Sequence, residues 1–427
     1  MKLFIEPTRN EWSEITKRPT FDNSHLESII QPVLDQIQLH GDKAVLDFTE
    51  KFDGVRLTNL LVTSEEFEQS IDEVSEGLKS AIDLAIKNIT IFHTAQKENF
   101  TPVETMSGVT CWRESRAIEK VGLYIPGGTA PLFSTILMLA IPAKIAGCSE
   151  VVLCTPPNKL GQIHPAIRYA AFKVGVSKLV KAGGSQAIAA MAFGTESVPK
   201  VYKIFGPGNQ FVTAAKQMVN KLGVSIDMPA GPSEVQVIAD DNAIASFVAS
   251  DLLSQAEHGV DSQVILVCSS VSKANEVLEE VRVQLELLPR KEMAAKALEN
   301  SKTIVLASFE DTVDFTNAYA PEHLIIQTDN YRNYIERIVN AGSVFLGAFT
   351  PESAGDYASG TNHTLPTNGY ARSYSGVSLD SFLKYITVQE ISQEGLQQLS
   401  PTIIAMAEAE QLQGHANAVS IRLRKHV

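Results

Sequence analysis

The stretch that decides the fold runs from Val235-Gln236-Val237-Ile238, through the helical pattern of residues 243–258, to Val264-Ile265-Leu266-Val267. Each outer segment is a short apolar run rich in β-branched residues, which is typical of a buried strand. The middle segment has the length and the apolar spacing of a helix. A strand, a helix and a second strand in this order predict two parallel strands joined by a crossover helix.

The same alternation extends in both directions, from about Val121 to Gly347. Further strands are predicted at residues 151–154, 179–181, 203–205, 303–306, 324–326 and 344–346, and further helices at residues 133–145, 186–193, 209–222 and 273–288. A segment rich in proline and glycine, residues 228–233, interrupts the pattern and favours two sheets over one. We therefore expect an α/β fold with two doubly wound, incomplete Rossmann-like parallel sheets.

The flanking regions lack this alternation and are predicted to be helical. Helical patterns cover residues 26–52, with a break at Gly41, residues 64–98, and the chain after about Asp380, including residues 396–410. The expected divisions are residues 1–22 as an N-terminal helical segment, residues 23–122 with 233–376 as a first, discontinuous α/β domain, residues 123–232 as a second α/β domain, and residues 377–427 as a C-terminal tail. Such a tail often docks on a neighbour or a partner subunit.

Composition argues against several classes of partner. The 427 residues include 49 acids and 36 bases, for a formal net charge of -13, so neither a nucleic acid nor an anionic membrane is expected. The N-terminal residues show no secretory signal, and the most apolar stretch, residues 131–147, is too short and broken to span a bilayer. The cysteines show no close paired spacing, so we expect a reducing cytoplasm: Cys111, Cys148, Cys154 and Cys268.

Three loops that carry glycines follow predicted strands, where open α/β sheets bind ligands. They are residues 124–131 (YIPGGTAP), 181–186 (KAGGSQ) and 205–209 (FGPGN). Glycines let a pyrophosphate or a ribose approach the backbone, and the N-terminus of a following helix favours an anionic group. None of the loops has the G-x-G-x-x-G spacing, so each alone is equally compatible with an ordinary tight turn.

Gln255 and His258 stand three positions apart at a predicted helix end, so their side chains share a face and can hold one ligand. Gly259 is the expected stop, in the left-handed conformation. For this pair alone, a solvated polar helix end is the more frequent situation. Together with Asp356 and His415, the pair would form a nitrogen and oxygen site suited to zinc or a neighbouring divalent ion.

Glu322-His323 precedes a predicted strand, and a carboxylate beside an imidazole suits general acid and base catalysis, although a solvated loop is an equal alternative. Four histidines stand beside acids, amides or glycines: His258, His323, His363 and His415. The other five are predicted at the surface: His25, His40, His93, His164 and His426. Cys154, at a strand end, is expected to pack as a small apolar residue.

Six strings, in the same order, resemble the motifs of the histidinol dehydrogenase family. They are residues 123–128 (LYIPGG), 205–209 (FGPGN), 227–234 (DMPAGPSE), 253–259 (LSQAEHG), 321–323 (PEH) and 360–363 (GTNH). The resemblance covers nearly the whole chain from about Ile29, and each motif residue of the family is present. It implies an enzyme dependent on zinc and NAD that oxidises L-histidinol to L-histidine through L-histidinal, in two successive hydride transfers, as the last step of histidine biosynthesis.

The resemblance also implies a role for each matching residue. The zinc ligands, for one ion per subunit, would be Gln255, His258, Asp356 and His415. The substrate contacts would be Ser233, His323, His363 and Glu410, with the four zinc ligands reaching the substrate through or beside the metal. The NAD contacts would be Tyr124, Gln186 and Asn209. The family it resembles is homodimeric, so residues 377–427 would form a dimerisation tail whose Glu410 and His415 complete the partner's site.

The chemistry of these residues is consistent with the implied roles. Histidinol offers an imidazole and an amine, so zinc, or manganese in its place, would orient the substrate rather than activate water. His323 would accept the alcohol proton and later that of the aldehyde hydrate, and Glu322 would activate the water.

Two alternatives are a zinc-assisted NAD dehydrogenase of another amino alcohol and a two-lobed binding protein. Missing export signals and the Glu322-His323 pair argue against the binding protein.

Overall fold

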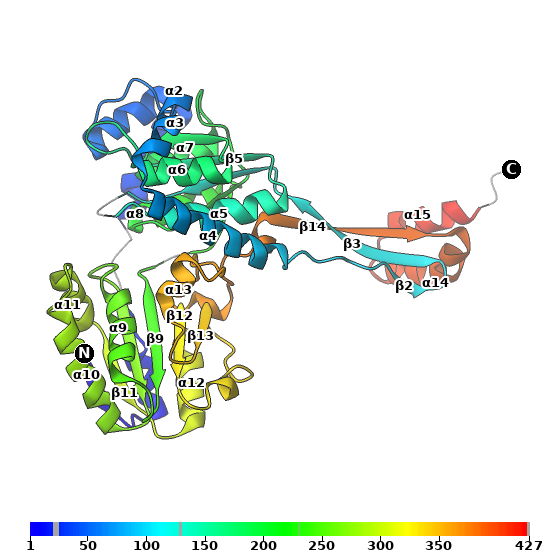
Figure 1. Cartoon of the computed structure of the whole chain (residues 1–427). Helices are drawn as coiled ribbons and strands as arrows, with labels where there is room; N and C mark the ends of the chain where they lie inside the picture. The colour runs from blue at the N-terminus through cyan, green and yellow to red at the C-terminus, as the bar shows by residue number, and fades with distance from the viewer. Residues whose placement is uncertain (20–24, 128–129, 230, 425–427) are drawn as a thin grey trace. The chain divides into compact units, whose positions relative to one another are not determined.

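The structure, a computed structural model, describes residues 1–19, 25–127, 130–229 and 231–424. The chain divides into two compact units, residues 1–96 with 118–381 and residues 97–117 with 382–427. The first unit contains two parallel sheets flanked by helices (Figure 1), and the second contains an antiparallel sheet with two helices. The expected α/β fold with two Rossmann-like sheets is confirmed.

The first sheet contains both strand segments of the fold-deciding stretch, and its middle segment is the helix α9 that joins them. Its strand order is β1-β11-β10-β9-β12-β13, and every pair is parallel. The strands are β1 (Lys2–Ile5), β9 (Glu234–Ala239), β10 (Gln263–Cys268), β11 (Lys302–Val305), β12 (His323–Gln327) and β13 (Ser343–Leu346). The helices between them are α9 (Ala245–Ala256), α10 (Val271–Leu285), α11 (Lys291–Glu299) and α12 (Phe309–Tyr319).

Alternate residues of this sheet enter two separate apolar cores. Val237 and Leu266 belong to one buried cluster, whereas Ile238 and Ile265 belong to another. Because successive side chains of a strand point to opposite faces, the sheet is covered on both sides. This explains why its strands read as continuous apolar runs rather than as an alternating pattern.

The second sheet repeats the same winding. Its strand order is β6-β5-β4-β7-β8, again all parallel. The strands are β4 (Lys120–Tyr124), β5 (Glu150–Thr155), β6 (Lys178–Lys181), β7 (Lys203–Phe205) and β8 (Ser225–Ile226), and the helices are α5 (Phe133–Ala146), α6 (Pro165–Val174), α7 (Gly184–Phe193) and α8 (Gln210–Lys221). In each sheet the first strand of the repeat lies between the second and the fourth, so the winding reverses at β9/β12 and at β4/β7, the positions where such sheets bind ligands.

The early helices pack on the second sheet, which corrects the expected assignment of residues 23–122 to the first α/β domain. They are α2 (Leu26–Asp53), α3 (Ser64–Glu73) and α4 (Glu76–Thr94). Leu26, Ile30 and Leu34 share a buried cluster with Val152 and Val180 of the second sheet. An amphipathic pattern shows that a helix has an apolar face but not which sheet buries it. The predicted break at Gly41 is confirmed, since its φ is 53°.

The predicted helical character of both ends is partly wrong. Residues 1–22 begin with strand β1, which pairs with β11, followed by the short helices η1 (Arg9–Glu11) and α1 (Trp12–Ile15). The second unit contains the strands β2 (Val103–Met106), β3 (Val109–Ala117) and β14 (Leu383–Ile391), before α14 (Gln393–Ala409) and α15 (Gln413–Leu423). β14 pairs antiparallel with all of β3. Residues 97–117 therefore belong with the tail, not with the first α/β domain.

Strands β3 and β14 are hard to predict from the sequence because their side chains are mostly half-exposed or exposed, so neither strand shows a buried apolar run.

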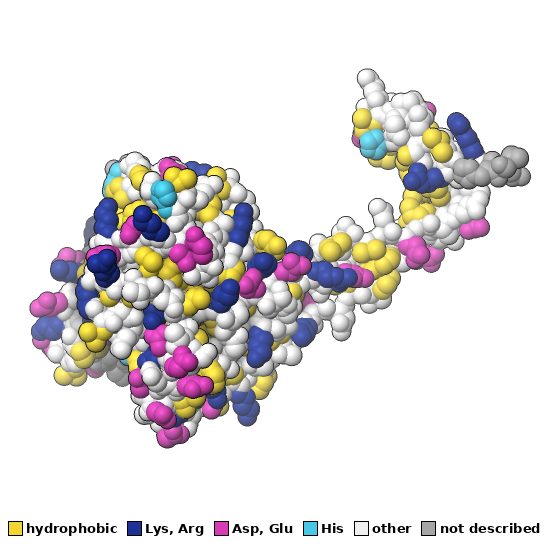
Figure 2. Space-filling model, turned by 90° about the horizontal axis from the view of Figure 1, so that it is seen from above, with side chains coloured by type: hydrophobic (Ala, Val, Ile, Leu, Met, Phe, Trp, Pro, Cys, Tyr) yellow, Lys and Arg dark blue, Asp and Glu magenta, His cyan; other side chains and the backbone are white. Residues whose placement is uncertain are grey.

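The remaining short helices are η2 (Tyr331–Tyr334), α13 (Glu352–Tyr357), η3 (Tyr370–Arg372) and η4 (Leu379–Phe382). Within the described ranges, no helix combines the length and the apolar character that crossing a membrane requires. Acidic and basic side chains are interspersed over the face drawn in Figure 2.

Candidate active site and metal centre

The two candidate catalytic residues lie where the chain enters β12, at the amino end of a first-sheet strand. Helix α12 ends at Tyr319, Ala320 adopts a left-handed φ of 55°, and Pro321 prevents the helix from continuing. Glu322 and His323 follow at once, with only 5% and 3% of their surface exposed. His323 pairs in register with Val235 of β9, so both side chains lie beside the start of that strand.

The first residue of β9, Glu234, bonds both of them through its main chain. Its N–H donates to Glu322 Oε2 at 2.8 Å, and its carbonyl oxygen accepts from His323 Nδ1 at 3.2 Å. A carbonyl can only accept, so Nδ1 carries the proton and Nε2 is the free acceptor. Burial lowers the pKa of His323 to about 3 and raises the pKa of Glu322 well above its usual value. His323 is therefore a neutral imidazole whose basic nitrogen is Nε2.

Gln255 lies in the last turn of α9, and His258 stands two residues after the end of this helix. The helix stops at Ala256, Glu257 keeps helical angles, and Gly259 lies outside the left-handed region, so the predicted glycine stop is wrong. Instead, the His258 N–H donates to the Gln255 carbonyl at 3.2 Å, which tightens the end into a 3₁₀ turn and satisfies that carbonyl. No left-handed residue is needed to end the helix this way.

A group of metal-ligand type forms around His258. Ligand atoms of His258, Glu352 and Asp356 lie within 4.8 Å of one another. Glu352 and Asp356 are four residues apart on α13 and so share one face of that helix. His323 Nε2 lies 3.8 Å from Asp356 Oδ1, which joins this group to the catalytic pair.

The donor set fits a divalent cation. Among the described residues, neither amide atom of the buried Gln255 has a hydrogen-bond partner. Burial, followed by the charges of Asp356 and Glu322, raises the pKa of Glu352 well above its usual value, and burial raises the pKa of Asp356 to about 6. Buried carboxyls crowd together at a cost unless they hold protons or share a cation. A nitrogen, an amide and two carboxylates match the ligands of zinc and its neighbours.

The imidazole of His363 contacts the main chain of Asp356. Its Nδ1 donates to the Asp356 carbonyl oxygen at 2.8 Å, and its Nε2 lies 3.1 Å from Thr135 Oγ1 on α5. Ser233 immediately precedes Glu234, and its carbonyl oxygen accepts from the Gln263 N–H at 3.2 Å. The structure thus brings together most of the expected substrate contacts. Glu410 and His415 belong to the second unit, where both are exposed.

The three expected NAD contacts lie in or after loops at the carboxyl edge of the second sheet. Tyr124 ends β4, and its hydroxyl accepts from the Gly184 N–H at 3.0 Å. Gln186 lies in the first turn of α7, and Asn209 caps α8 by accepting from two backbone N–H groups at 3.1 and 3.2 Å. Gly206, with a φ of 124°, passes so close to Tyr124 that a Cβ there would lie 2.0 Å from its carbonyl oxygen. The loops therefore converge at the β4/β7 reversal.

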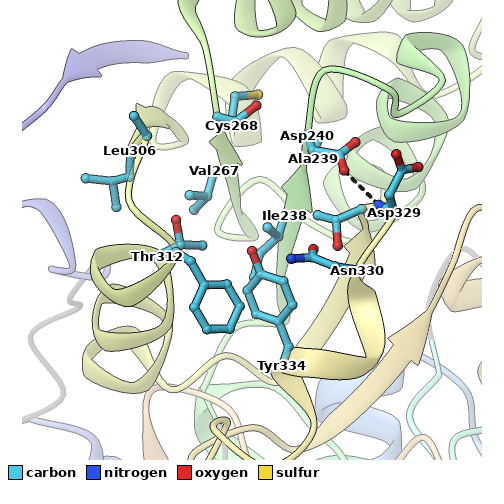
Figure 3. A pocket seen from close by; sticks show the side chains of 14 residues that line it. Ile238, Ala239, Asp240, Val267, Cys268, Leu306, Thr312, Asp329, Asn330 and Tyr334 are labelled. Atoms are coloured by element: carbon cyan, nitrogen blue, oxygen red, sulfur yellow. Dashed lines mark hydrogen bonds between the residues drawn. The ribbon is translucent and has the colours of Figure 1, made fainter.

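The corresponding edge of the first sheet has a different character. A cavity of about 400 Å³ lies at the carboxyl ends of β9, β10 and β12, at the opposite strand end from His323 (Figure 3). It is lined by Asp240 and Asp329, whose N–H donates to Asp240 Oδ2 at 2.7 Å, and its lining includes no glycine, lysine or arginine. A phosphate there would face the carboxylates of Asp240 and Asp329, which repel it.

Comparison with known proteins shows which family the chain belongs to. The protein-family model described as histidinol dehydrogenase matches residues 16–423 of this chain. The chain belongs to the histidinol dehydrogenase family. A histidinol dehydrogenase of Bacteroides thetaiotaomicron is 61% identical over 99% of both chains. The chloroplastic histidinol dehydrogenase of Arabidopsis thaliana is 53% identical over 98% of this chain and 90% of its own. As expected, the chain is an oxidoreductase of a family in histidine biosynthesis.

A solved structure supports the fold of this family member. The crystal structure of histidinol dehydrogenase from Elizabethkingia anophelis is 55% identical, covers 99% of this chain and 98% of its own, and has a TM-score of 0.98. A similarity of this degree extends over both units. The resemblance carried by the six sequence strings is therefore confirmed.

Two acids that lie beside the candidate site residues were not predicted from the sequence, Glu352 and Glu234. Glu352 stands four residues before Asp356, and this helical spacing could have revealed it. Glu234 ends the motif string of residues 227–234, but its side-chain type gave no sign of the contacts that its main chain makes with Glu322 and His323.

His25, His40 and His164 are exposed, as predicted. The prediction that His93 lies at the surface is wrong, because its side chain is fully buried and its Nδ1 lies 3.0 Å from the Ile89 carbonyl oxygen. Gly128, Thr129, Ala230 and His426 lie outside the described residues. Cys154 is fully buried in the core, as expected.

Proposed function

We propose that the chain catalyses the NAD-dependent, four-electron oxidation of L-histidinol to L-histidine through L-histidinal, with zinc orienting the substrate. The observation that carries this proposal is the meeting of the Glu322-His323 pair with the group of His258, Glu352 and Asp356, where His323 Nε2 lies 3.8 Å from Asp356 Oδ1. A base and a cation site so close together can act on one small molecule that has both an alcohol and metal-binding groups. Relatives named histidinol dehydrogenase support histidinol as that molecule.

The residues that would hold zinc are Gln255, His258 and Asp356, with His415 as the fourth ligand and Glu352 as a nearby acid. Bound zinc would fix the imidazole and amine of the substrate rather than generate a hydroxide. The buried amide of Gln255, which has no hydrogen-bond partner among the described residues, supports this assignment, since a buried amide without a partner is costly. Manganese has the same preference for nitrogen and oxygen ligands, so the assignment concerns the site more than the element.

Tyr124, Gln186 and Asn209 are the proposed NAD contacts. They surround the β4/β7 reversal of the second sheet, where the N-terminus of α8 favours a pyrophosphate. Gly206 lets the loop approach closely, because any side chain at this position would strike Tyr124. Bound NAD would supply the acceptor for one hydride in each of the two oxidations.

The proton steps follow from the hydrogen bonds of the catalytic pair. The bond from Nδ1 to the Glu234 carbonyl oxygen fixes the tautomer of the neutral His323, so Nε2 would accept the alcohol proton in the first oxidation. His323 would release that proton to solvent before the second oxidation. Glu322 would remove a proton from the water that adds to the aldehyde, and the neutral His323 would then accept the proton of the hydrate. Ser233 and His363 would contact the substrate on either side. No thiol is needed, and the buried Cys154, whose pKa burial raises, is unsuited to act as one.

The dimer is part of the same proposal. Glu410 and His415 would complete the site of the partner subunit in a homodimer, because both are exposed on a unit of their own. The tail, residues 377–427, would then serve for dimerisation. We further propose a cytoplasmic location, with no nucleic acid or membrane as partner, in line with the net charge of -13.

The deciding experiment measures NADH formed per histidinol consumed, with NAD in excess. The proposal predicts about two NADH and one histidine, because each hydride transfer reduces one NAD. A ratio near one, or faster turnover of a different amino alcohol, would instead favour a zinc-assisted NAD dehydrogenase of another amino alcohol. Absence of any turnover by the metal-loaded protein would refute both.

A further inference from the structure

The main chain of Glu234 forms hydrogen bonds with both members of the proposed catalytic pair. Its N–H bonds Glu322 at 2.8 Å and its carbonyl oxygen bonds His323 at 3.2 Å, so the placement of one residue orients both side chains. A displacement of the start of β9 would change the direction of both side chains together. Whatever holds Glu234 therefore bears on the reacting groups.

The side chain of Glu234 is held by an arginine from the N-terminal segment. Arg18 Nε lies 2.5 Å from Glu234 Oε2, and a terminal nitrogen of Arg18 lies 2.9 Å from Oε1. These two parallel bonds form the planar fork that only arginine offers to a carboxylate. The side chains of Arg18 and Glu234 are only 11% and 2% exposed.

The same guanidinium also holds the segment that leads to the catalytic pair. It donates to the carbonyl oxygens of Tyr319 at 2.7 Å and Ala320 at 3.3 Å, and it stacks 4.1 Å from the centre of the Tyr319 ring. Tyr319 Oη in turn lies 3.2 Å from Glu234 Oε2. Two stretches far apart in sequence, the start of β9 and the turn before β12, thus meet on one side chain.

Docking of the N-terminal segment does not depend on this arginine. β1 pairs with β11 along its whole length, and Arg9 bonds Asp311 and Asp314 on α12 at 2.7 and 2.6 Å. A buried ion pair rarely repays in stability the cost of removing its charges from water. The value of the Arg18–Glu234 pair is therefore more readily found in geometry than in holding the segment down.

We propose that Arg18, acting through Glu234, is a positioning residue for the Glu322-His323 pair. The inference rests on the proposed function, since it assumes that this pair carries out the proton steps. It adds a part of the chain, the N-terminal segment, that has no contact with substrate or cofactor in the proposed mechanism. Arg18 would act by holding two backbone segments in register, without touching a reacting atom.

The test compares Arg18→Ala and Arg18→Lys with Arg9→Ala in the metal-loaded full-length protein, using histidinol and NAD. A displacement of about 1 Å at reacting groups can cost about 100-fold, so we expect kcat of Arg18→Ala to fall by about that factor. The KM for NAD and the metal content should stay unchanged, because neither site contacts Arg18. Added guanidinium ion should restore part of kcat. Arg9→Ala should stay within a few-fold of the parent, because exposed ion pairs contribute little.

The inference is overturned if Arg18→Ala keeps the kcat of Arg9→Ala, or if a fall in kcat comes with a higher KM for NAD and a lower metal content. Should Arg18→Ala fail to fold, Arg18→Lys and Glu234→Gln provide the test. Two residues that act as a unit give non-additive losses of kcat. The double variant that combines Arg18→Lys with Glu234→Gln should therefore be no slower than the slower of the two single variants. Additive losses of kcat would refute the coupling. A parent that makes no NADH from histidinol would instead refute the proposed function.

Discussion

Replacing Glu322 by Gln should separate the two oxidations. The Glu234 N–H donates to Glu322 Oε2 at 2.8 Å, and a glutamine amide oxygen can accept the same bond, so the side chain should keep its place. The variant loses only the carboxylate that would activate water. A general base contributes about 10²–10⁴-fold. Because His323 Nδ1 lies 3.6 Å from Glu322 Oε2 and the imidazole stays in place, we expect the lower half of that range, about 10²–10³-fold.

The assay follows NADH formation and histidinal in single turnovers with excess NAD. Glu322→Gln should release the first NADH at close to the parental rate and the second far more slowly, with histidinal recoverable by a carbonyl-trapping reagent. Glu310→Gln, an exposed acid of α12 paired with Arg337, serves as the matched control and should behave like the parent. The free energy of unfolding should not fall, because a buried carboxyl is removed and its hydrogen bond kept. Equal slowing of both steps, or of neither, would refute the assignment of water activation to Glu322.

Three further outcomes are expected. His258→Asn should lower the content of zinc, measured by elemental analysis, while circular dichroism stays parental, and full metal content would contradict the metal assignment. Mixing inactive His323→Ala with inactive His415→Ala chains should restore some activity in mixed dimers, whereas no recovery after proven subunit exchange would mean that each chain builds its own site. Burial lowers the pKa of Lys302 from 10.5 to about 8, so the unfolded chain binds more protons between these values and the free energy of unfolding should rise with pH across that window. In urea titrations this rise should be smaller in Lys302→Met, by up to about 3 kcal/mol, and equal pH dependence of the two proteins would contradict the shift.

Most of the parallel strands could be predicted from the sequence because their signal is local. Val264-Ile265-Leu266-Val267 is apolar throughout, since both faces of its sheet are buried, and it forms the centre of β10. The six motif strings likewise identified the family, as the comparisons confirm. The roles of the individual site residues stay predictions, but the sequence alone placed Gln255, His258 and Asp356 in one set.

What the sequence could not show depended on partners far along the chain. Strand β14 exists because it pairs with β3, more than 250 residues earlier, and its mixed polar pattern reads as a helix or a loop without that partner. The packing of α2 on the second sheet was equally hidden, because an apolar face does not name what buries it. His93 was predicted at the surface for the same reason.

The sequence by itself determined the alternation of strands and helices, the family, and most of the polar residues that converge on the first sheet. Only the tertiary structure decided how those residues are held. It placed Glu352 beside Asp356 and His258, and it brought Arg18 onto Glu234 across 216 positions of sequence. Periodicity and spacing describe the neighbourhood of a residue along the chain, whereas hydrogen bonds made by a main chain or by a distant guanidinium depend on where the folded backbone passes.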